Sequence, residues 1–328
     1  MDRPVGFDSQ TEVLSTVGWR YIESLTDEWI AQYSIGTSEI QFSPPAEPPS
    51  STRYTGLMSS IVGSGVSLLV TPDHLLPLKR RGLPSVFPAS ACKRHLKLPS
   101  AGTMNDGILD PNITIPKARL VAAWQADGTV LNASNTPKRG DLLRNHHFGW
   151  KIKKERKKNR LRILLADCGV TWSERSYPSC KEWTVFCVRR QELLWLYNYV
   201  SDDSFSWKIT NWPLLVRQTF LKELGYWDGD FPGKTNIRFF TSDLASANLV
   251  SAVAVISGFS SVLSLRPARE QRPGNLPEYV FSTIPNLSWR ERRRDSTLVS
   301  YNGFIHRCKM KSGFVVVRRY GKCCVAAC

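Results

Sequence analysis

Hydrophobic and polar positions follow different periods in different parts of the chain. Near both ends the apolar residues come in short runs bounded by turn residues, which is typical of β-strands. A Pro- and Ser-rich stretch at 43–51 predicts a loop between such runs. The pattern predicts strands over residues 11–14, 19–22, 66–70, 314–317 and 323–325.

The central part has longer periodic segments. Over residues 147–153 apolar side chains alternate with Lys151 and Lys153, which predicts a strand with one apolar and one cationic face. Pro116 opens a predicted helix and Gly169 follows the end of another. The pattern predicts helices over 116–126, 154–167, 214–226 and 242–256, and strands over 147–153, 183–188 and 236–241.

The order helix, strand, helix therefore occurs twice, about a hundred residues apart, which indicates an internal duplication. A polar linker is predicted over 82–112, before the first of these helices. The coarse prediction is a β-rich module formed by both chain ends, with an α+β insert between its halves.

The longest uncharged stretch, residues 244–265, is too polar and too interrupted for a membrane span, which needs about 20 mostly apolar residues. Gly258 would separate a buried helix from a strand within it. The N-terminus has no basic start followed by an apolar run, so we expect no signal peptide.

Charge gives the first indication of a partner. The chain has 328 residues, enough for two or three domains, and carries 44 Lys and Arg against 28 Asp and Glu, a net charge of +16. Such a surplus favours a polyanion, either nucleic acid or an anionic membrane. Eight cysteines without a CxxC pair predict reduced thiols in an intracellular, cytoplasmic protein.

Thr71 and His74 are spaced for acyl chemistry. A Thr hydroxyl and its main chain can hydrogen-bond a scissile carbonyl, while an imidazole three residues later protonates the departing nitrogen. Taken alone, this spacing in a turn is usually structural.

The surrounding segments resemble the opening and closing blocks of phage-type inteins. The opening is Gly6-Phe7-Asp8-Ser9-Gln10-Thr11-Glu12-Val13-Leu14, and the closing segments are Cys308-Lys309-Met310, residues 313–322 and Val325-Ala326-Ala327-Cys328. The resemblance implies a horseshoe-shaped Hint module in which Thr71, His74 and Cys308 belong to the splicing site. Gly6 and Ala327 stand where the family has a Cys and an Asn, so we expect no splicing. Cys328 would be the first residue of the downstream host sequence.

DNA cleavage needs a nucleophilic water and a stabilised leaving oxygen, and divalent ions held by carboxylates supply both. Two packed helices can each deliver one carboxylate from the C-terminal end. The stretches Leu120-Val121-Ala122-Ala123-Trp124-Gln125-Ala126-Asp127-Gly128 and Leu221-Lys222-Glu223-Leu224-Gly225-Tyr226-Trp227-Asp228-Gly229 fit this and resemble the LAGLIDADG motif. The resemblance implies that Asp127 and Asp228 are the catalytic, metal-binding acids. Lys222 and Glu223 depart from the small or apolar residues usual there.

Basic residues are concentrated between Lys151 and Arg162, in the strand and helix that follow the first of these motifs. Beside a metal site they favour contact with DNA phosphates, although a charge run is often only a solvated face. The resemblance also implies a basic residue near the active site, either Lys151 or Lys153. The predicted DNA contacts are Lys151, Lys153, Lys154, Arg156, Lys157 and, in the second half, Arg238.

The resemblance divides the chain as follows: upstream host residues 1–5, Hint module 6–98 and 287–327, endonuclease 99–286 with αββαββα pseudo-repeats at about 113–200 and 213–286, and downstream residue 328. The expected activity is Mg²⁺-dependent cleavage of double-stranded DNA at a long specific site by a monomer. The alternatives are a DNA-binding but decayed nuclease, a splicing element with a passive insert, and, least well supported, a Hedgehog-like autoprocessing protein.

Overall fold

The structure is a computed structural model. It describes residues 4–80, 83–92, 97–105, 110–131, 147–177, 180–201, 204–233, 235–267, 277–284, 289–291 and 296–328. The chain divides into two compact units, which are described separately. Unit 1 comprises residues 1–108, 232–236 and 240–328, and unit 2 comprises 109–231 and 237–239.

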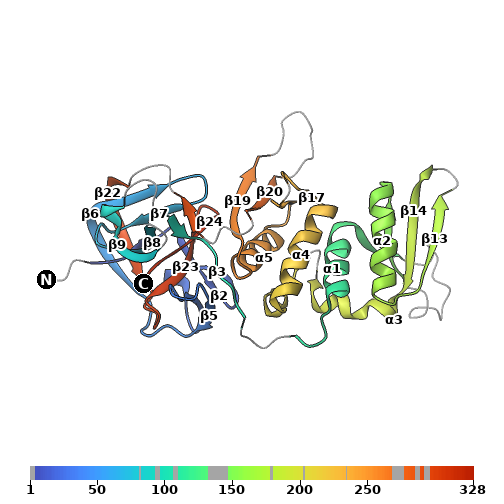
Figure 1. Ribbon diagram of the computed structural model, residues 1–328, viewed down its shortest axis with the longest axis horizontal. Coiled ribbons are helices and arrows are strands. Elements are labelled where there is room, and N and C mark those ends of the chain that lie inside the picture. The colour runs from blue at the N-terminus through green and yellow to red at the C-terminus, as the bar shows by residue number, and fades with distance from the viewer. Residues whose placement is uncertain are drawn as a thin grey trace. The chain divides into compact units, whose positions relative to one another are not determined.

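Unit 1 is built mainly from strands of both chain ends (Figure 1). Its elements are β1 (Phe7–Asp8), β2 (Thr11–Ser15), β3 (Gly18–Tyr21), β4 (Ile30–Tyr33), β5 (Ile40–Ser43), β6 (Ser50–Val62), β7 (Ser67–Val70), β8 (Leu75–Arg80), β9 (Leu83–Pro88), β10 (Lys97–Pro99), α5 (Leu244–Val255), β19 (Ser260–Arg266), β20 (Glu278–Ile284), β21 (Trp289–Glu291), β22 (Thr297–Arg307), β23 (Phe314–Arg319) and β24 (Lys322–Ala327).

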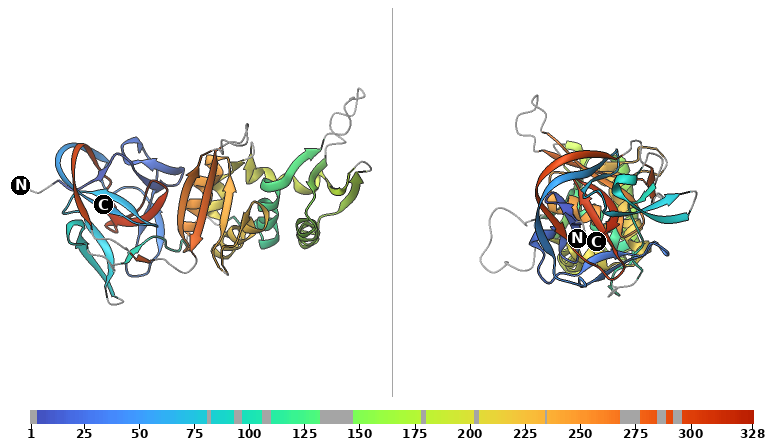
Figure 2. Two further views of the ribbon diagram at one scale, coloured as in Figure 1. Left: turned by 90° about the horizontal axis from the view of Figure 1, so that it is seen from above. Right: turned by 90° about the vertical axis from the view of Figure 1, so that its left-hand side faces the viewer.

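Both chain ends meet in the same sheets of unit 1, where blue and red ribbons lie together (Figure 2). Strands β1, β22, β6 and β7 close into a barrel, and a second sheet has the order β21-β10-β8-β9. A third runs β20-β19-β24-β23-β2-β4-β5, with β3 paired to β2. The core between them includes Phe7, Val13, Leu68, Val315 and Val317.

Unit 2 combines helices with a four-stranded antiparallel sheet of order β11-β12-β14-β13. Its elements are α1 (Ile115–Asp127), β11 (Gly128–Leu131), β12 (His147–Ile152), α2 (Glu155–Asp167), β13 (Trp172–Tyr177), β14 (Cys180–Arg189), α3 (Arg190–Leu193), β15 (Val200–Ser201), β16 (Ser204–Phe205), α4 (Leu214–Trp227) and β17 (Gly229–Asp230). Strand β18 (Arg238–Thr241) starts in unit 2 and ends in unit 1.

The predicted alternation in the first half is confirmed. Phe148, Trp150 and Ile152 are buried on one face of β12, whereas Lys151 is exposed between them. The predicted helices are present within a few residues of their expected ends, and the order helix, strand, strand, helix, strand, strand occurs twice. Structural equivalence of the two halves remains a prediction.

The linker predicted over 82–112 is wrong for much of its length. It contains β9 and β10, and Ala89, Cys92 and Leu98 are buried. Pro84 and Pro88 obscure the strand pattern. Among the described residues β9 pairs with β8 alone, so its prolines lie on an edge strand, where they are tolerated.

No helix of the described residues is long and apolar enough to cross a membrane, and the stretch at 244–265 forms α5 and most of β19.

Residues of the second predicted repeat belong to unit 1 because β19 joins the strand that leads to the C-terminus. Val262 pairs with Lys322, and the Leu263 N–H donates to the Gly321 carbonyl at 2.8 Å. Gly321 has a φ of +72°, and a Cβ there would lie 1.9 Å from the Leu263 carbonyl oxygen. Only glycine fits this turn without moving the backbone.

Helix α5 is held against the N-terminal strands by one arginine. Arg318 forms two hydrogen bonds of 2.7 Å with the Glu12 carboxylate and donates to the Asn248 side chain at 2.7 Å. Its guanidinium also lies 4.5 Å from the Trp19 ring centroid, and the Trp19 indole donates to the Asn248 carbonyl. The described residues from 240 to 284 are therefore structurally part of the unit formed by the chain ends, while the functional boundaries at 99 and 286 remain predictions.

Because the turn at Gly321 packs tightly against β19, we predict that an alanine destabilises the protein more at Gly321 than at Gly313, although the two glycines have similar φ. We expect Gly321→Ala to lower the free energy of unfolding by roughly 2 kcal/mol more than Gly313→Ala. Gly313 has a φ of +75° but nothing within 4 Å of an added Cβ, so it isolates the cost of the left-handed backbone. Chemical denaturation of both variants measures the difference, and equal losses would contradict a tight junction.

Candidate functional sites

Helices α1 and α4 pack side by side in unit 2 (Figure 1). Ala122 and Ala123 of α1 are buried, and their small size permits close approach of a neighbouring helix. Gly225 of α4 is buried as well, but its missing side chain leaves room for the Phe231 ring, which an added Cβ would meet at 2.5 Å. Asp127 is the last residue of α1, and Asp228 directly follows α4. The packing therefore brings the two predicted carboxylates to the same end of the helix pair.

A glycine follows each carboxylate because the chain turns sharply there. A Cβ on Gly128 would lie 2.4 Å from the Trp124 carbonyl oxygen, and one on Gly229 would lie 2.1 Å from the Arg238 carbonyl oxygen. Both turns lead directly into a strand, β11 or β17. The Asp-Gly sequence thus ends each helix and fixes where its carboxylate lies.

Lys157 joins the two carboxylates. Its ammonium lies 2.5 Å from Asp127 Oδ2 and 3.4 Å from Asp228 Oδ1, and its side chain is only 8% exposed. The ammonium also lies 5.5 Å from the Trp227 ring centroid, a cation–π distance. Partial burial raises the pKa of Asp228, and the charge of Lys157 opposes this shift.

Lys157 comes from the first turn of α2, which starts after Lys154; the Lys154 carbonyl accepts the Lys157 N–H at 2.9 Å. The sequence placed Lys157 among the DNA contacts and favoured Lys151 or Lys153 for the position near the acids. In the structure, Lys153 pairs with Glu182, and the Lys151 ammonium lies 5.2 Å from the Trp183 ring centroid. The remaining predicted contact on α2, Arg156, donates to the Tyr226 carbonyl at 2.6 Å.

Glu223, which departs from the LAGLIDADG motif, links helices α1, α2 and α4 through ion pairs. Its carboxylate is 2% exposed and accepts from Arg119 of α1 at 2.9 Å and from Arg160 of α2 at 2.5 and 2.6 Å. The Trp227 indole adds a fourth hydrogen bond at 2.9 Å. Lys222, the other departure, is exposed on α4. The poorer match to the motif is therefore explained by an ion-pair network rather than by a damaged helix.

We expect Glu223→Gln to lower the free energy of unfolding by about 3 kcal/mol, because it leaves two arginines without their buried counter-charge. Glu182→Gln is the matched control, since Glu182 also pairs with a basic residue but is exposed. Urea denaturation of both variants gives the comparison. A Glu223→Gln variant as stable as the control would show that the network contributes nothing to folding.

The donor set at the helix ends fits a hard divalent cation. Mg²⁺ in nucleic acid enzymes is usually held by one or two carboxylates, with water and substrate phosphates completing its shell. The Asp127 and Asp228 side chains are 27% and 42% exposed, so their oxygens can reach such a shell. No group of three or more His, Cys, Asp or Glu side chains in the described part of the chain is placed to hold a metal.

The predicted splicing residues gather in unit 1. The Gly6 N–H donates to Thr71 Oγ1 at 3.2 Å, and the Thr71 N–H donates to the Gly6 carbonyl at 3.1 Å. A Cβ on Gly6 would lie 3.0 Å from both the His306 carbonyl oxygen and Ile305 Cβ, so a larger residue would be crowded. His74 is buried against Phe7, with ring centroids 4.5 Å apart.

His74 also lies near Ala327, at the C-terminal end of the predicted splicing element. Burial lowers the pKa of His74 to about 4, an effect that the main chain of Ala327 opposes. The imidazole is therefore neutral at pH 7. It lies near Ala327, the position at which inteins have an Asn.

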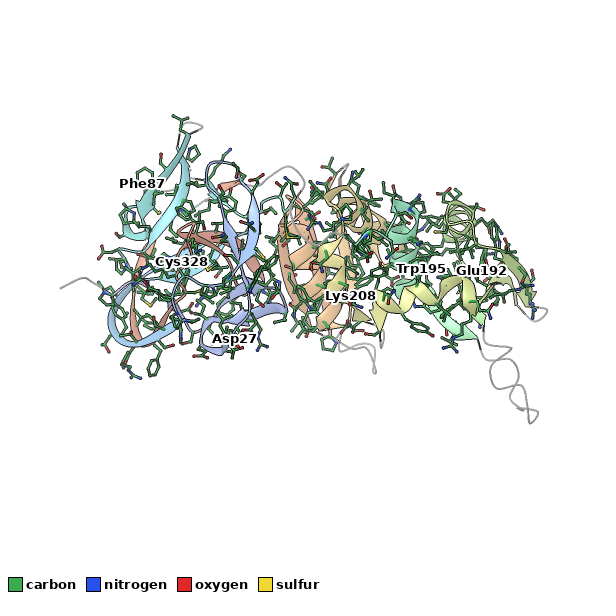
Figure 3. All side chains as sticks on the ribbon, turned by 90° about the horizontal axis from the view of Figure 1, so that it is seen from below. Asp27, Phe87, Glu192, Trp195, Lys208 and Cys328 are labelled. Atoms are coloured by element: carbon green, nitrogen blue, oxygen red, sulfur yellow. The ribbon has the colours of Figure 1, made fainter. Side chains whose placement is uncertain are left out.

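The two thiols of the predicted splicing site are protonated at neutral pH. Burial raises the pKa of Cys308 to about 12 and that of Cys328 to about 11. Cys328 Sγ accepts the Met310 N–H at 3.2 Å, and Cys328 lies among the strands of unit 1 (Figure 3). Neither thiol is activated as a nucleophile in this arrangement.

One set of cations was missed by sequence reasoning. Arg175 of β13 and Arg189 of β14 are exposed, and the register of the sheet places them on the same face as Lys151. The pairing of β12 with β14 shows this, and no spacing along the chain marks Arg175 and Arg189 as neighbours of Lys151. The second-half candidate, Arg238, forms a double hydrogen bond with Asp230 at 2.7 and 2.5 Å.

No protein-family model matches the chain, and no curated protein does. Among solved structures, the chain is similar to the homing endonuclease I-DmoI in complex with DNA and Mn, at 14% identity and a TM-score of 0.37, over 52% of this chain and 89% of that one. It is also similar to a splice-inactive variant of the AceL NrdHF class 3 split intein, at 16% identity and a TM-score of 0.27, over 31% and 65%. For the gp41-1 intein the values are 13%, 0.24, 30% and 70%. These are the two classes of protein that the sequence motifs resemble, but at these scores the likeness alone establishes no activity.

Proposed function

We propose that the chain is an intein-like element whose insert is a LAGLIDADG-type endonuclease that cuts double-stranded DNA at a long specific site. The observation that carries this proposal is the pair of carboxylates at the ends of α1 and α4, held on either side of Lys157. The host gene lacking this element is the expected target. A monomer suffices, because both motifs are in one chain.

Asp127 and Asp228 would hold Mg²⁺, which when bound activates water and stabilises the leaving oxygen of the phosphodiester. The chain's own residues set the geometry. The carboxylates are fixed by the two Asp-Gly turns, and Lys157 balances part of their charge. With DNA bound, the same ammonium could stabilise negative charge on a phosphate that enters beside the two acids.

The carboxylate pair predicts the outcome of two substitutions. Asp127→Asn and Asp228→Asn should each lower cleavage by at least about a hundredfold, because an amide binds Mg²⁺ far more weakly than a carboxylate does. Cleavage is measured in Mg²⁺ on a library of candidate insertion sites. Asp167→Asn, which changes a carboxylate at the end of α2 that pairs with Arg119, is the matched control and should cut normally.

The library also separates the rival functions. Specific binding without cleavage by the unaltered chain would favour a decayed nuclease. Absence of salt-sensitive DNA binding would favour a splicing element with a passive insert. Cutting of one strand only would mean that one of the two acids no longer serves catalysis.

We also propose that the chain does not splice. Gly6 has no nucleophile to attack the upstream bond, and Ala327 has no carboxamide to attack its own carbonyl. The remaining candidates, Cys308 and Cys328, carry buried thiols of high pKa.

Ala327→Asn tests the C-terminal half of this proposal. In a fusion carrying a reporter after Cys328, the Asn side-chain nitrogen can attack its own carbonyl, break the 327–328 bond and free the Cys328 amino group. Neutral His74 beside this bond should assist, so we expect the variant to release the reporter and the unaltered chain to stay intact on a denaturing gel. Release by the unaltered chain, or a hydroxylamine-sensitive branched product, would contradict the proposal by showing that a thiol attacks.

A further inference from the structure

Lys157 already binds oxygens that a divalent cation would need. Its ammonium lies 2.5 Å from Asp127 Oδ2 and 3.4 Å from Asp228 Oδ1, so one positive group is shared between the two carboxylates. Mg²⁺ binds carboxylate oxygens at about 2.0 to 2.1 Å. The ammonium therefore has to leave before a metal ion can take these two oxygens. A metal ion on the other oxygen of either carboxylate would still lie beside a like charge.

The ammonium is also held by an aromatic ring. It lies 5.5 Å from the Trp227 ring centroid, and the Trp227 indole donates to the buried Glu223 carboxylate at 2.9 Å. The Lys157 side chain is 8% exposed, so salt and water screen its contacts less than those of a surface lysine. Lys157 therefore competes strongly for the two acids.

A displaced ammonium needs another anion. Glu223, the nearest acid before Asp228 in the sequence, is already bound by Arg119 at 2.9 Å and by Arg160 at 2.5 Å. A DNA phosphate that enters beside the acids would supply a new partner, because lysine binds phosphate well as a point charge. The same phosphate would add an oxygen ligand for the metal. The arrival of DNA would thus remove the competitor and add a ligand together.

We propose that Lys157 is a built-in competitor for the divalent cation, which keeps the acid pair weakly loaded until a DNA phosphate draws the ammonium away. This inference rests on the proposed nuclease function and adds a coupling to it: DNA and metal bind more tightly together than either does alone. Because such coupling is reciprocal, DNA tightens metal binding by the same factor by which metal tightens DNA binding.

The first test measures Mn²⁺ binding to the full chain without DNA, by electron paramagnetic resonance. Lys157→Gln should tighten Mn²⁺ binding by at least about tenfold, because a charge in contact with both acids no longer opposes the metal. Lys157→Arg keeps a cation at this position and should bind Mn²⁺ as weakly as the unaltered chain does. Lys157→Met, a second neutral variant, carries the test if the Gln variant does not fold.

Two neighbouring lysines show whether contact or only charge is responsible. Lys158 is about as buried as Lys157, at 9% exposure, but pairs with Glu155 at 3.3 Å. Lys154 is exposed, and its charge acts on Asp228 from a distance. Lys158→Gln and Lys154→Gln should each tighten Mn²⁺ binding by less than about threefold. Effects as large as that of Lys157→Gln would overturn the inference, since a general loss of positive charge would then explain it.

The second test adds the duplex that binds most tightly in the library of candidate insertion sites. The unaltered chain should bind Mn²⁺ at least about fivefold more tightly with this duplex than without it, and Lys157→Gln should show a smaller gain. The double variant with Asp127→Asn and Asp228→Asn measures the Mn²⁺ that the DNA itself holds, and this amount is subtracted.

The outcomes separate the inference from the proposed function. Unchanged Mn²⁺ binding in the neutral Lys157 variants, or an equal gain with DNA in Lys157→Gln and the unaltered chain, would overturn the competition while leaving the proposed nuclease intact. If neither the unaltered chain nor a Lys157 variant binds Mn²⁺ more tightly than the double Asp variant, with or without DNA, the acids hold no metal. The proposed function then fails, and the inference fails with it.

Discussion

The ion pair that Lys157 makes with two carboxylates is the interaction on which the candidate nuclease site depends. Asp127 and Asp228 come from different helices and would repel each other without a cation between them. A lysine that is 8% exposed is tolerated because both acids pair with it. Since one ammonium serves both acids, a change at Lys157 affects both candidate cleavage sites together.

The helices that carry these groups are also linked by ion pairs one to about two turns further along each helix. Glu223 of α4 accepts from Arg119 of α1 and from Arg160, which is one turn beyond Lys157 on α2. The acid pair and its lysine are therefore positioned by a second, more deeply buried ion network. Positions held this way move little, which is what binding a metal ion at a fixed geometry requires.

The sequence was informative where a signal is local. Asp-Gly after each helical stretch gave the ends of α1 and α4, and the alternation around Trp150 gave the buried face of β12. It failed where pairing is long-range: β9 carries two prolines and is a strand only because β8 lies beside it. The positions of Lys157 and Arg175 depend on tertiary packing and on sheet register, which no spacing along the chain encodes.

The two chain ends form a common unit to which α5 and β19 also belong, so the candidate splicing and nuclease parts share a sheet. The central claim, however, concerns the acid pair. Its most direct test is the binding of Mn²⁺, followed by electron paramagnetic resonance, in the presence of duplex DNA. The account predicts a site that is lost when Asp127 and Asp228 are both changed to Asn and kept when Asp167 is changed. Equal Mn²⁺ binding by the double variant and the unaltered chain would contradict it.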